Sequence, residues 1–324
     1  MQTVTSLTSA FPRSEALVEA TRDLDRGRTT PEAVQELYRR TEAEVAQLEE
    51  RLELELRTGG YLRWQDLFRP FAETWEGFTV GPLTRWFETN QFFRQPILHA
   101  PPARVAGAIV NWLPTAGKDG SHRRKAILPG PYTFSGLVDN RSGETSEALT
   151  HRLGRLLGEE VRDLRTAGYG AFQFQEPLLV TRRPEGARAE AVVAAYQAIA
   201  DGADGATTAV WTFFGDAQPA WPLLTRLPVS VVGVDLSETD ALKLAPPTER
   251  RGLGLGVIDP RTSLVEEPEA VVHLVRSIAE RQRPTALWIG TGAPLDLLPW
   301  EPAIRKLHVL PAVRQGLAAS GGSS

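Results

Sequence analysis

The stretch Val229-Ser-Val-Val-Gly-Val-Asp-Leu-Ser237 is the best guide to the fold of this 324-residue chain. It is almost uniformly apolar, is rich in β-branched residues, and ends in an acidic residue that a leucine and a serine follow. A strand with apolar residues on both faces is typical of a parallel sheet that helices cover on both sides. We therefore expect a buried parallel strand here, with Asp235 at its carboxyl end.

Seven further runs of this kind occur along the chain, most of them flanked by Gly or Pro and separated by helical patterns. In order, the eight runs are Thr3–Leu7, Gly59–Arg63, Ala126–Leu128, Ala171–Phe174, Ala209–Phe213, Val229–Val234, Gly254–Val257 and Ala286–Ile289. Eight such strands alternating with helices predict an α/β fold, a closed (β/α)8 TIM barrel. We expect one domain over residues 1–318 and a polar tail over residues 319–324.

Four stretches between these runs repeat apolar residues at helical spacing, with charged residues on the other faces. They are Pro31–Leu56, Thr145–Ala167, Glu190–Ala200 and Pro268–Glu280. Thr30 before Pro31 is a suitable N-cap, because its hydroxyl can accept a hydrogen bond from the first turn and proline is favoured at the first helical position. These patterns predict the helices that cover the barrel.

The segment from Trp64 to Arg124, between the second and third runs, is too long and too apolar for a bare loop. Its aromatic residues are Trp64, Phe68, Phe71, Trp75, Phe78, Trp86, Phe87, Phe92 and Phe93. We expect an aromatic-rich insertion after the second strand that folds over the mouth of the barrel.

The composition excludes several classes of function. The chain has no cysteine, which excludes disulfides, thiolate catalysis and cysteine-ligated metals. Its net charge of −4 gives no reason to expect nucleic acid or an acidic membrane as a partner. No apolar run approaches the ~20 residues that span a bilayer, and the first residues lack a signal-peptide pattern. We expect a cytoplasmic protein with a small-molecule ligand.

Polar residues that follow a barrel strand are candidates for the site, because barrel enzymes place their chemistry at the carboxyl ends of the strands. Glu176 ends Phe172-Gln-Phe-Gln-Glu-Pro177, where a structural contact to a neighbouring loop is the alternative. Leu128-Pro-Gly-Pro-Tyr-Thr-Phe134 offers the hydroxyls of Tyr132 and Thr133, although the motif taken alone is better explained as a plain strand-to-helix turn. His99, in the aromatic insertion, is the one histidine that we place at the pocket.

Several short motifs, in order, resemble those of the cobalamin-independent methionine synthase family, within the wider group of uroporphyrinogen decarboxylase-like barrels. They are Ser9-Ala-Phe-Pro-Arg13, Gly59-Gly-Tyr-Leu-Arg63 with Asp66, Leu128-Pro-Gly-Pro-Tyr-Thr133, Gln173-Phe-Gln-Glu-Pro177, Gly254-Leu-Gly-Val-Ile-Asp259 with Val265-Glu266, and Leu287-Trp288 before Leu295 and Leu298-Pro299. The resemblance runs from about Ser6 to Leu317. It is to the compact form that has only the C-terminal, catalytic barrel, and it implies a TIM barrel that transfers a methyl group.

The resemblance also identifies the positions that hold zinc in the family, and this chain lacks the ligands there. The family's His-x-Cys at a strand end reads Trp211-Thr-Phe213, and its second cysteine is Ala293. The family's glutamate corresponds to Asp235. Because zinc needs three or four ligands, we expect no metal. Trp211 and Phe213 would instead make this pocket aromatic and suited to a flat ligand.

The resemblance also identifies the positions that bind the amino-acid substrate in the family, and this chain lacks the family's groups there as well. The positions that grip homocysteine in the family read Gly60, Gln175 and Ala10, none of them charged. The retained candidates give Arg63, Glu176 and Asp235 as catalytic residues. The candidates for substrate binding are Tyr132, Thr133, Gln175, Trp211, Phe213, Asp66 and His99.

Two functions stay open. The first is a zinc-independent methyltransferase with a methylated folate or a corrinoid as methyl donor. The second is a non-catalytic binding protein or partner subunit that keeps a pocket for a methyl carrier or another heteroaromatic ligand, with a protein partner or a homo-oligomer in view. A uroporphyrinogen decarboxylase-like enzyme ranks last, because the N-terminal turn lacks the arginines that a polycarboxylate needs.

Overall fold

The computed structural model describes residues 2–114, 123–247 and 249–319. Eight parallel strands form one sheet in the order β1-β11-β10-β9-β8-β7-β5-β2. They are β1 (Gln2–Thr5), β2 (Leu56–Arg57), β5 (Arg123–Pro129), β7 (Tyr169–Gln175), β8 (Thr207–Trp211), β9 (Val231–Asp235), β10 (Gly252–Ile258) and β11 (Ala286–Thr291). A parallel bridge between Ser6 and Leu56 joins the first and last strands of this order. The predicted TIM barrel is confirmed.

The second strand lies earlier than the sequence predicted. The strand is Leu56–Arg57, and Gly59–Tyr61 form a 3-10 turn instead of the start of a strand. Gly59 and Gly60 have φ values of +69° and +80°, a left-handed conformation that a strand cannot contain. The preceding helix correspondingly ends at Arg51 rather than at Leu56.

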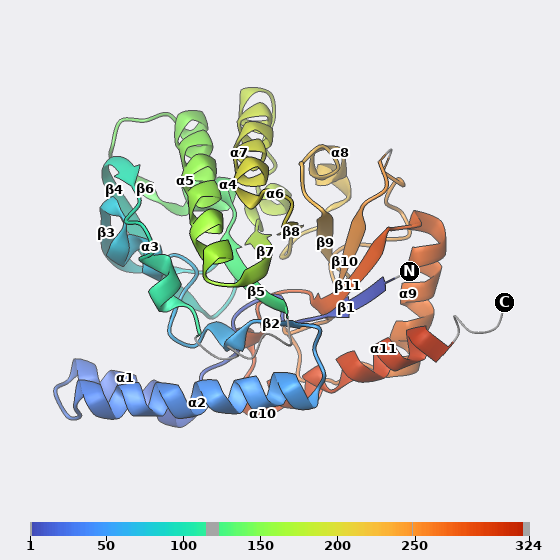
Figure 1. The fold of residues 1–324 in the computed structure, drawn as a ribbon, viewed down its shortest axis with the longest axis horizontal. Helices are drawn as coiled ribbons and strands as arrows, with labels where there is room; N and C mark the ends of the chain where they lie inside the picture. Colours follow the sequence, from blue (N-terminus) through green and yellow to red (C-terminus); the bar gives the residue numbers. More distant parts are fainter. Residues whose placement is uncertain (1, 115–122, 248, 320–324) are drawn as a thin grey trace.

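Helices lie around the barrel (Figure 1). They are α1 (Glu15–Asp25), α2 (Pro31–Arg51), α3 (Arg69–Thr74), α4 (Pro131–Leu137), α5 (Ser146–Thr166), α6 (Leu178–Thr181), α7 (Ala187–Ala203), α8 (Trp221–Leu224), α9 (Pro268–Gln282), α10 (Trp300–Leu307) and α11 (Val309–Ala319). Thr30 and Thr145 cap α2 and α5 through their side chains, each accepting a hydrogen bond from the backbone N–H three residues on. Helices α5 and α7 lie side by side, because Gly158 and Gly202 let the two backbones approach closely.

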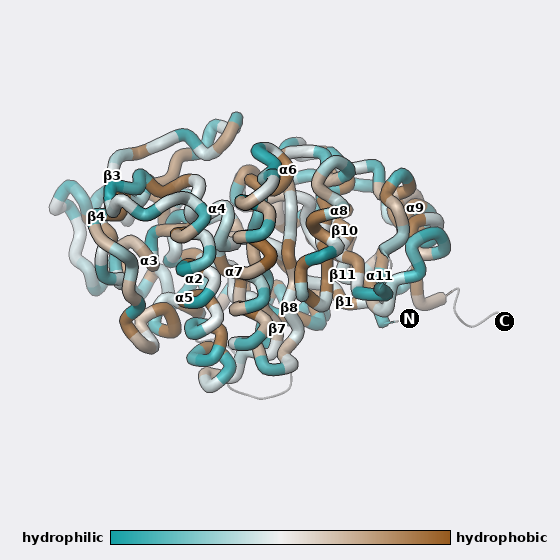
Figure 2. Tube along the Cα trace, turned by 90° about the horizontal axis from the view of Figure 1, so that it is seen from above, coloured by the Kyte–Doolittle hydropathy of each residue, from teal (hydrophilic) through white to brown (hydrophobic). Residues whose placement is uncertain are grey.

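The hydrophobic core runs along the strands. Every residue of β9 and β10 is buried, as expected of parallel strands covered on both faces. Figure 2 shows hydrophobic residues concentrated around β10 and hydrophilic residues toward the outer turns.

The predicted insertion consists of α3, a long hairpin of β3 (Glu76–Arg85) and β4 (Phe92–Ala103), and a short 3-10 helix, Ile109–Trp112. The hairpin forms a separate three-stranded sheet with β6 (Asp139–Asn140). Its tip, from Trp86 to Phe93, reaches the carboxyl ends of the barrel strands, where it lines a cavity. At the base of the insertion, Phe71 packs against Trp75 and also against Phe134 of α4.

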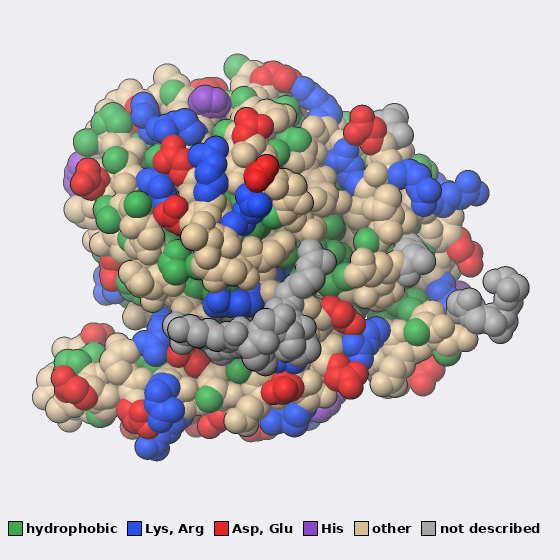
Figure 3. Space-filling view, viewed as in Figure 1, with side chains coloured by type: hydrophobic (Ala, Val, Ile, Leu, Met, Phe, Trp, Pro, Cys, Tyr) green, Lys and Arg blue, Asp and Glu red, His purple; other side chains and the backbone are tan. Residues whose placement is uncertain are grey.

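The face of the molecule in Figure 3 carries acidic and basic side chains that alternate over short distances, especially over α5 and its neighbours. Ion pairs such as Arg155–Glu159 and Arg188–Glu147 account for part of this alternation. Within the ranges that the structure describes, no helix is both long and apolar enough to cross a membrane.

Candidate ligand-binding site

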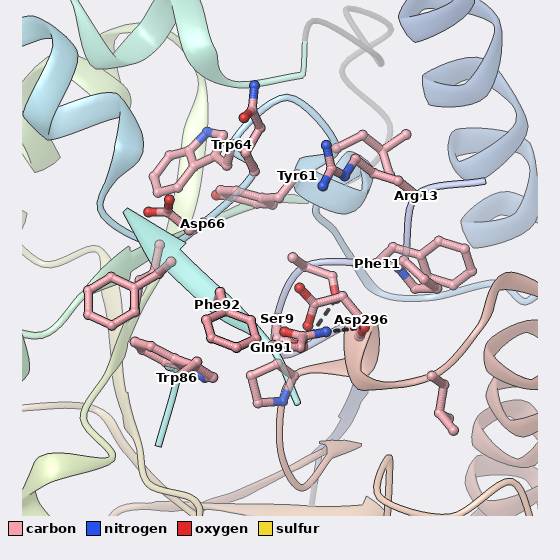
Figure 4. Close-up of a pocket in the computed structure, with 18 of the residues that line it drawn as sticks. Ser9, Phe11, Arg13, Tyr61, Trp64, Asp66, Trp86, Gln91, Phe92 and Asp296 are labelled. Carbon is pink, nitrogen blue, oxygen red and sulfur yellow. Dashed lines mark hydrogen bonds between the residues drawn. The ribbon is translucent and has the colours of Figure 1, made fainter. Parts of the chain in front are cut away.

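A cavity of about 490 Å³ lies at the mouth of the barrel. Four segments line it: the loop after β1, the turn after β2, the hairpin tip and the loop after β11 (Figure 4). Ile127 of β5, Gln175 at the end of β7 and Arg22 of α1 also line it. The cavity is thus at the end of the barrel where this fold places its ligands.

Aromatic rings form much of the cavity wall. Tyr61 and Trp64 meet edge to face with ring centroids 4.8 Å apart. Trp86 and Phe93 of the hairpin tip meet in the same way at 5.4 Å. Phe92 also lines the cavity and remains 53% exposed, so a large apolar ring is open to whatever enters. Such walls suit a flat ring held by stacking.

Arg13 and Asp296 place opposite charges in this aromatic cavity. Arg13 is half-buried and extends toward the centre beside Tyr61 (Figure 4), and no carboxylate of the described residues forms an ion pair with it. Asp296 lies in the 3-10 turn Leu295–Leu297. Burial raises the pKa of its carboxyl to about 7, and the nearby Arg13 opposes that rise.

Two polar contacts fix the loop that carries Asp296. The Gln91 side chain of the hairpin tip donates to the backbone oxygen of Asp296. The Ser9 hydroxyl accepts a hydrogen bond of 2.9 Å from the backbone N–H of Leu295. The Oδ1 atom of Asp296 is buried and has no hydrogen-bond partner among the described residues. This oxygen is therefore enclosed by the protein and is not open to the cavity.

Two predicted binding residues, Asp66 and Gln175, do line the cavity. The Asp66 carboxylate accepts hydrogen bonds from the backbone N–H groups of Phe68, Arg69 and Arg94, at 2.8 to 3.1 Å. Burial nevertheless raises its pKa. The Gln175 amide donates to the backbone oxygen of Thr8 at 3.0 Å. Because their polar atoms are engaged in this way, both side chains also hold the wall together.

Glu176 lies outside the cavity, beneath the N-terminus of α4. Its carboxylate accepts hydrogen bonds from the backbone N–H groups of Tyr132 and Thr133, at 3.0 and 2.8 Å, and from the Thr133 hydroxyl at 2.6 Å. A Cβ on Gly130 would lie 2.1 Å from the Glu176 carboxyl carbon, so only glycine fits there. Burial raises the pKa of Glu176 to about 7. The two motifs after β5 and β7 are therefore halves of one structural contact.

Four other predicted residues also lie away from the cavity. Arg63 pairs with Glu42 of α2, with Nε 2.6 Å from Oε1. His99 is exposed on β4, where its Nε2 is 2.8 Å from the Thr79 hydroxyl. Tyr132 donates through its hydroxyl to the backbone oxygen of Arg182 at 2.8 Å. Phe213 is buried against Phe214. The structure does not bring Arg63, Glu176 and Asp235 together at one point in the cavity.

The positions compared with the family's zinc ligands do lie close together, but their side chains do not suit a metal. The Trp211 indole fills the interior of the barrel and donates to the backbone oxygen of Gly292, with Nε1 3.3 Å from that oxygen. Gly233 and Gly254 on the next two strands leave room for it, since a Cβ on either would lie within 2.4 Å of the ring.

Asp235 is the only acid at these positions, and its Oδ2 lies 3.5 Å from the Arg261 guanidinium. Burial raises the pKa of Asp235 to about 6, although Arg261 opposes that rise. One carboxylate beside an arginine and an indole cannot provide the three or four ligands that zinc needs. No cluster of three or more potential ligands occurs in the described part of the chain.

Sequence reasoning missed Arg13, Tyr61, Gln91 and Asp296 as site residues. Arg13 and Tyr61 belong to motifs that carried the family resemblance, so a signal for them was present. No sequence signal marked Asp296. It follows the turn that contains Ala293, and only its neighbours in the folded structure place it at the cavity.

Comparison with known proteins points to one family. A family model described as the N-terminal domain of cobalamin-independent synthase matches residues 75–283. The motifs above were compared with the catalytic C-terminal barrel, whereas the matching model is that of the N-terminal domain. A methionine synthase of Sulfurisphaera tokodaii is 26% identical over 309 residues, which cover 94% of this chain and 89% of the relative.

A 5-methyltetrahydropteroyltriglutamate–homocysteine methyltransferase of Nitratidesulfovibrio vulgaris is 30% identical over 239 residues, covering 67% of this chain but 30% of that longer relative. The solved structure of a B12-independent methionine synthase from Shewanella sp., in complex with selenomethionine, has a TM-score of 0.77 at 18% identity, covering 97% of this chain and 98% of that one. A putative B12-independent methionine synthase from Listeria monocytogenes has a TM-score of 0.76 at 15% identity, with 97% and 99% covered. These two structures support the barrel fold.

Proposed function

Because this chain belongs to the cobalamin-independent methionine synthase family, we propose that it is a divergent one-carbon protein that binds a flat, heteroaromatic methyl carrier and works without zinc. The aromatic cavity at the barrel mouth is the observation that carries this proposal. Its volume falls within the range of small-molecule sites.

A methylated folate suits the cavity better than a corrinoid. A pteridine ring is flat and can stack on Tyr61, Trp86 or Phe92, and the anionic end of a folate complements the guanidinium of Arg13. The Nitratidesulfovibrio vulgaris relative is named for a pteroyltriglutamate methyl donor. A corrinoid is a much larger macrocycle, and about 490 Å³ leaves little room for it.

Binding without catalysis is the better-supported form of this function. Arg63, Glu176 and Asp235 each have a structural partner elsewhere: Glu42, the N-terminus of α4, and Arg261. Trp211 fills the space in which a metal and a thiol substrate would have to meet. In this form the protein is a carrier-binding protein or a partner subunit, and it binds a soluble small molecule in the cytoplasm.

A zinc-independent methyltransferase is the second candidate, and Asp296 is the observation that favours it. Its carboxyl lines the cavity, and burial brings its pKa to about 7, near the value at which a general acid or base is most effective at neutral pH. In this form Asp296 replaces Glu176 and Asp235 as the acid/base group.

Thermal unfolding with a panel of ligands tests the proposal. A ligand at ~100 times its Kd adds roughly 2.7 kcal/mol to the free energy of unfolding. We expect stabilisation by methyltetrahydrofolate, in mono- and polyglutamyl forms, and none by homocysteine. After dialysis against zinc, metal analysis should find much less than one zinc ion per protein chain. Stabilisation by zinc together with homocysteine would overturn the proposal, and methyl transfer from the bound folate to an added thiol would favour the transferase.

A further inference from the structure

Exposed apolar side chains gather in two segments of the described chain. Seven large hydrophobic residues are exposed in it, and five of these lie either on the β3–β4 hairpin or on the loop of residues 259–267 after β10. These five are Val80, Leu83, Phe92, Leu264 and Val265. Leu83 and Leu264 are the most exposed on their segments, at 60% and 76%. Apolar residues that cluster on a surface mark interaction sites, whereas single ones do not.

The hairpin segment is basic. Leu83 and Arg85 alternate along β3 and so lie on one face, and Arg94 of β4 is directly opposite Leu83. Both arginines are exposed, and neither pairs with a carboxylate of the described residues. The Arg85 guanidinium lies over the ring of Phe92, 6.0 Å from its centroid. The hairpin thus presents a basic patch, which consists of Leu83, Arg85 and Arg94.

The loop after β10 carries the opposite charge. Glu267 and Glu269, at the start of α9, are exposed and form no ion pair within the described ranges. Lys306 holds the loop in place, because its ammonium donates to the backbone oxygen of Leu264 and pairs with Glu266 at 2.7 Å. The loop therefore presents a fixed acidic patch, which consists of Leu264, Val265, Glu267 and Glu269.

The two patches lie at the same end of the barrel but on opposite sides of it. The loop follows the carboxyl end of β10, and the hairpin tip reaches the carboxyl ends of the strands. Figures 1 and 2 both show β3 and β4 at one side of the molecule and α9, which follows the loop, at the other. The patches of one chain therefore cannot cover each other, whereas a second copy can bring an acidic patch to a basic one.

We propose that two copies of this chain form a closed dimer in which the basic patch of each copy packs on the acidic patch of the other. A two-fold rotation that turns the barrel mouths toward each other forms both contacts at once, because each copy carries one patch of each kind at that end. The apolar side chains supply buried surface, and the opposite charges set the pairing. The dimer does not depend on which ligand the cavity binds, and so goes beyond the proposed function.

Sedimentation velocity of the full chain, from micromolar to hundred-micromolar concentration, measures the association. We expect the wild-type protein to approach twice the mass of one chain as its concentration rises. Two charge-reversed variants test the pairing, Arg85→Glu/Arg94→Glu and Glu267→Arg/Glu269→Arg. Each should weaken dimerisation by ~10-fold or more, because both contacts of its dimer then bring like charges together.

An equimolar mixture of the two charge-reversed variants is the sharpest test. In a dimer with one copy of each, both contacts again join opposite charges, so the mixture should dimerise about as tightly as the wild-type protein. Arg51→Glu/Arg162→Glu is the matched control. It changes the net charge by the same amount as the hairpin variant, at exposed arginines where α2 and α5 lead into the next strands, and should leave the dimer unchanged.

Thermal unfolding shows whether each variant folds. If a double variant does not fold, Arg85→Glu or Glu269→Arg takes its place in the same comparison. Loss of the dimer in each charge-reversed variant and its return in the mixture support the proposal. A wild-type protein that stays monomeric, a charge-reversed variant that dimerises as the wild type does, or a mixture that stays monomeric overturns it. Ligand binding by a monomer would leave the proposed function standing, so the two proposals fail separately.

Discussion

At the scale of single residues, Trp211 and two glycines are fitted to one another. The indole occupies the barrel interior because Gly233 and Gly254 have no side chain, and a Cβ on Gly233 would lie 2.1 Å from the ring. Backbone and ring are both held in a packed interior, so neither can move away cheaply. The position of the Trp211 ring therefore depends on these two glycines as much as on the tryptophan itself.

The Gly233→Ala variant should lower the free energy of unfolding by about 2 kcal/mol, the cost of overpacking a core. Urea denaturation measures the loss. In a Trp211→Leu background the same alanine should cost much less, because the smaller side chain leaves room for the added methyl group. An equal cost in both backgrounds would show that the indole does not fill this space.

A second residue-scale prediction concerns Glu176. Removal of its carboxylate in Glu176→Ala leaves two backbone N–H groups and the Thr133 hydroxyl without their acceptor. We expect the free energy of unfolding to fall by about 3 kcal/mol, with carrier affinity unchanged. Glu185→Ala, at an exposed ion pair with Arg183, is the control and should change stability little. If the Glu176→Ala variant folds but no longer binds the ligand, Glu176 would have to be counted as a binding residue.

At the scale of elements, the β3–β4 hairpin provides a wall of the cavity. Phe92 and Leu83 lie on this hairpin and are similarly exposed, at 53% and 60%, but only Phe92 lines the cavity. Phe92→Ala should weaken carrier binding by ~10-fold through lost stacking, with little effect on the thermal midpoint. Leu83→Ala should leave the affinity unchanged. Equal affinities in the two variants would place the ligand elsewhere.

At the scale of the whole molecule, buried ionisable groups shape how stability depends on pH. Lys125 lies inside the barrel, where its Nζ donates to the Ser6 hydroxyl at 2.7 Å and to the Gln173 amide oxygen at 2.9 Å. Burial lowers its pKa to about 7. The unfolded chain then binds one more proton than the folded protein between about pH 7 and the ordinary lysine pKa near 10.4.

Stability should therefore rise from about pH 7 to about pH 9, and Lys125→Met should remove this rise. Urea denaturation at the two pH values measures it. Lys306→Met is the control, because Lys306 is also buried but pairs with Glu266 at 2.7 Å; this variant retains Lys125 and should retain the rise. If the free energy of unfolding of Lys125→Met rises by the same amount between these pH values, another group causes the rise.

The amino-acid sequence by itself determined the barrel and the aromatic insertion. Apolar runs, helical periodicity and residue identity are local properties, so the eight strands and the main helices could be predicted. The exception was the second strand, where the left-handed glycines at Gly59 and Gly60 displaced it to Leu56–Arg57.

Only the tertiary structure decided which side chains meet in the cavity. Gln175, the last residue of β7, lines the cavity, whereas the next residue, Glu176, contacts the N-terminus of α4. A sequence pattern that places an acid at the end of a strand does not say which way its side chain points. The contact of Gln91 with Asp296 spans 205 residues of chain. Partners so distant in sequence become neighbours only when the barrel closes and the hairpin tip reaches its mouth.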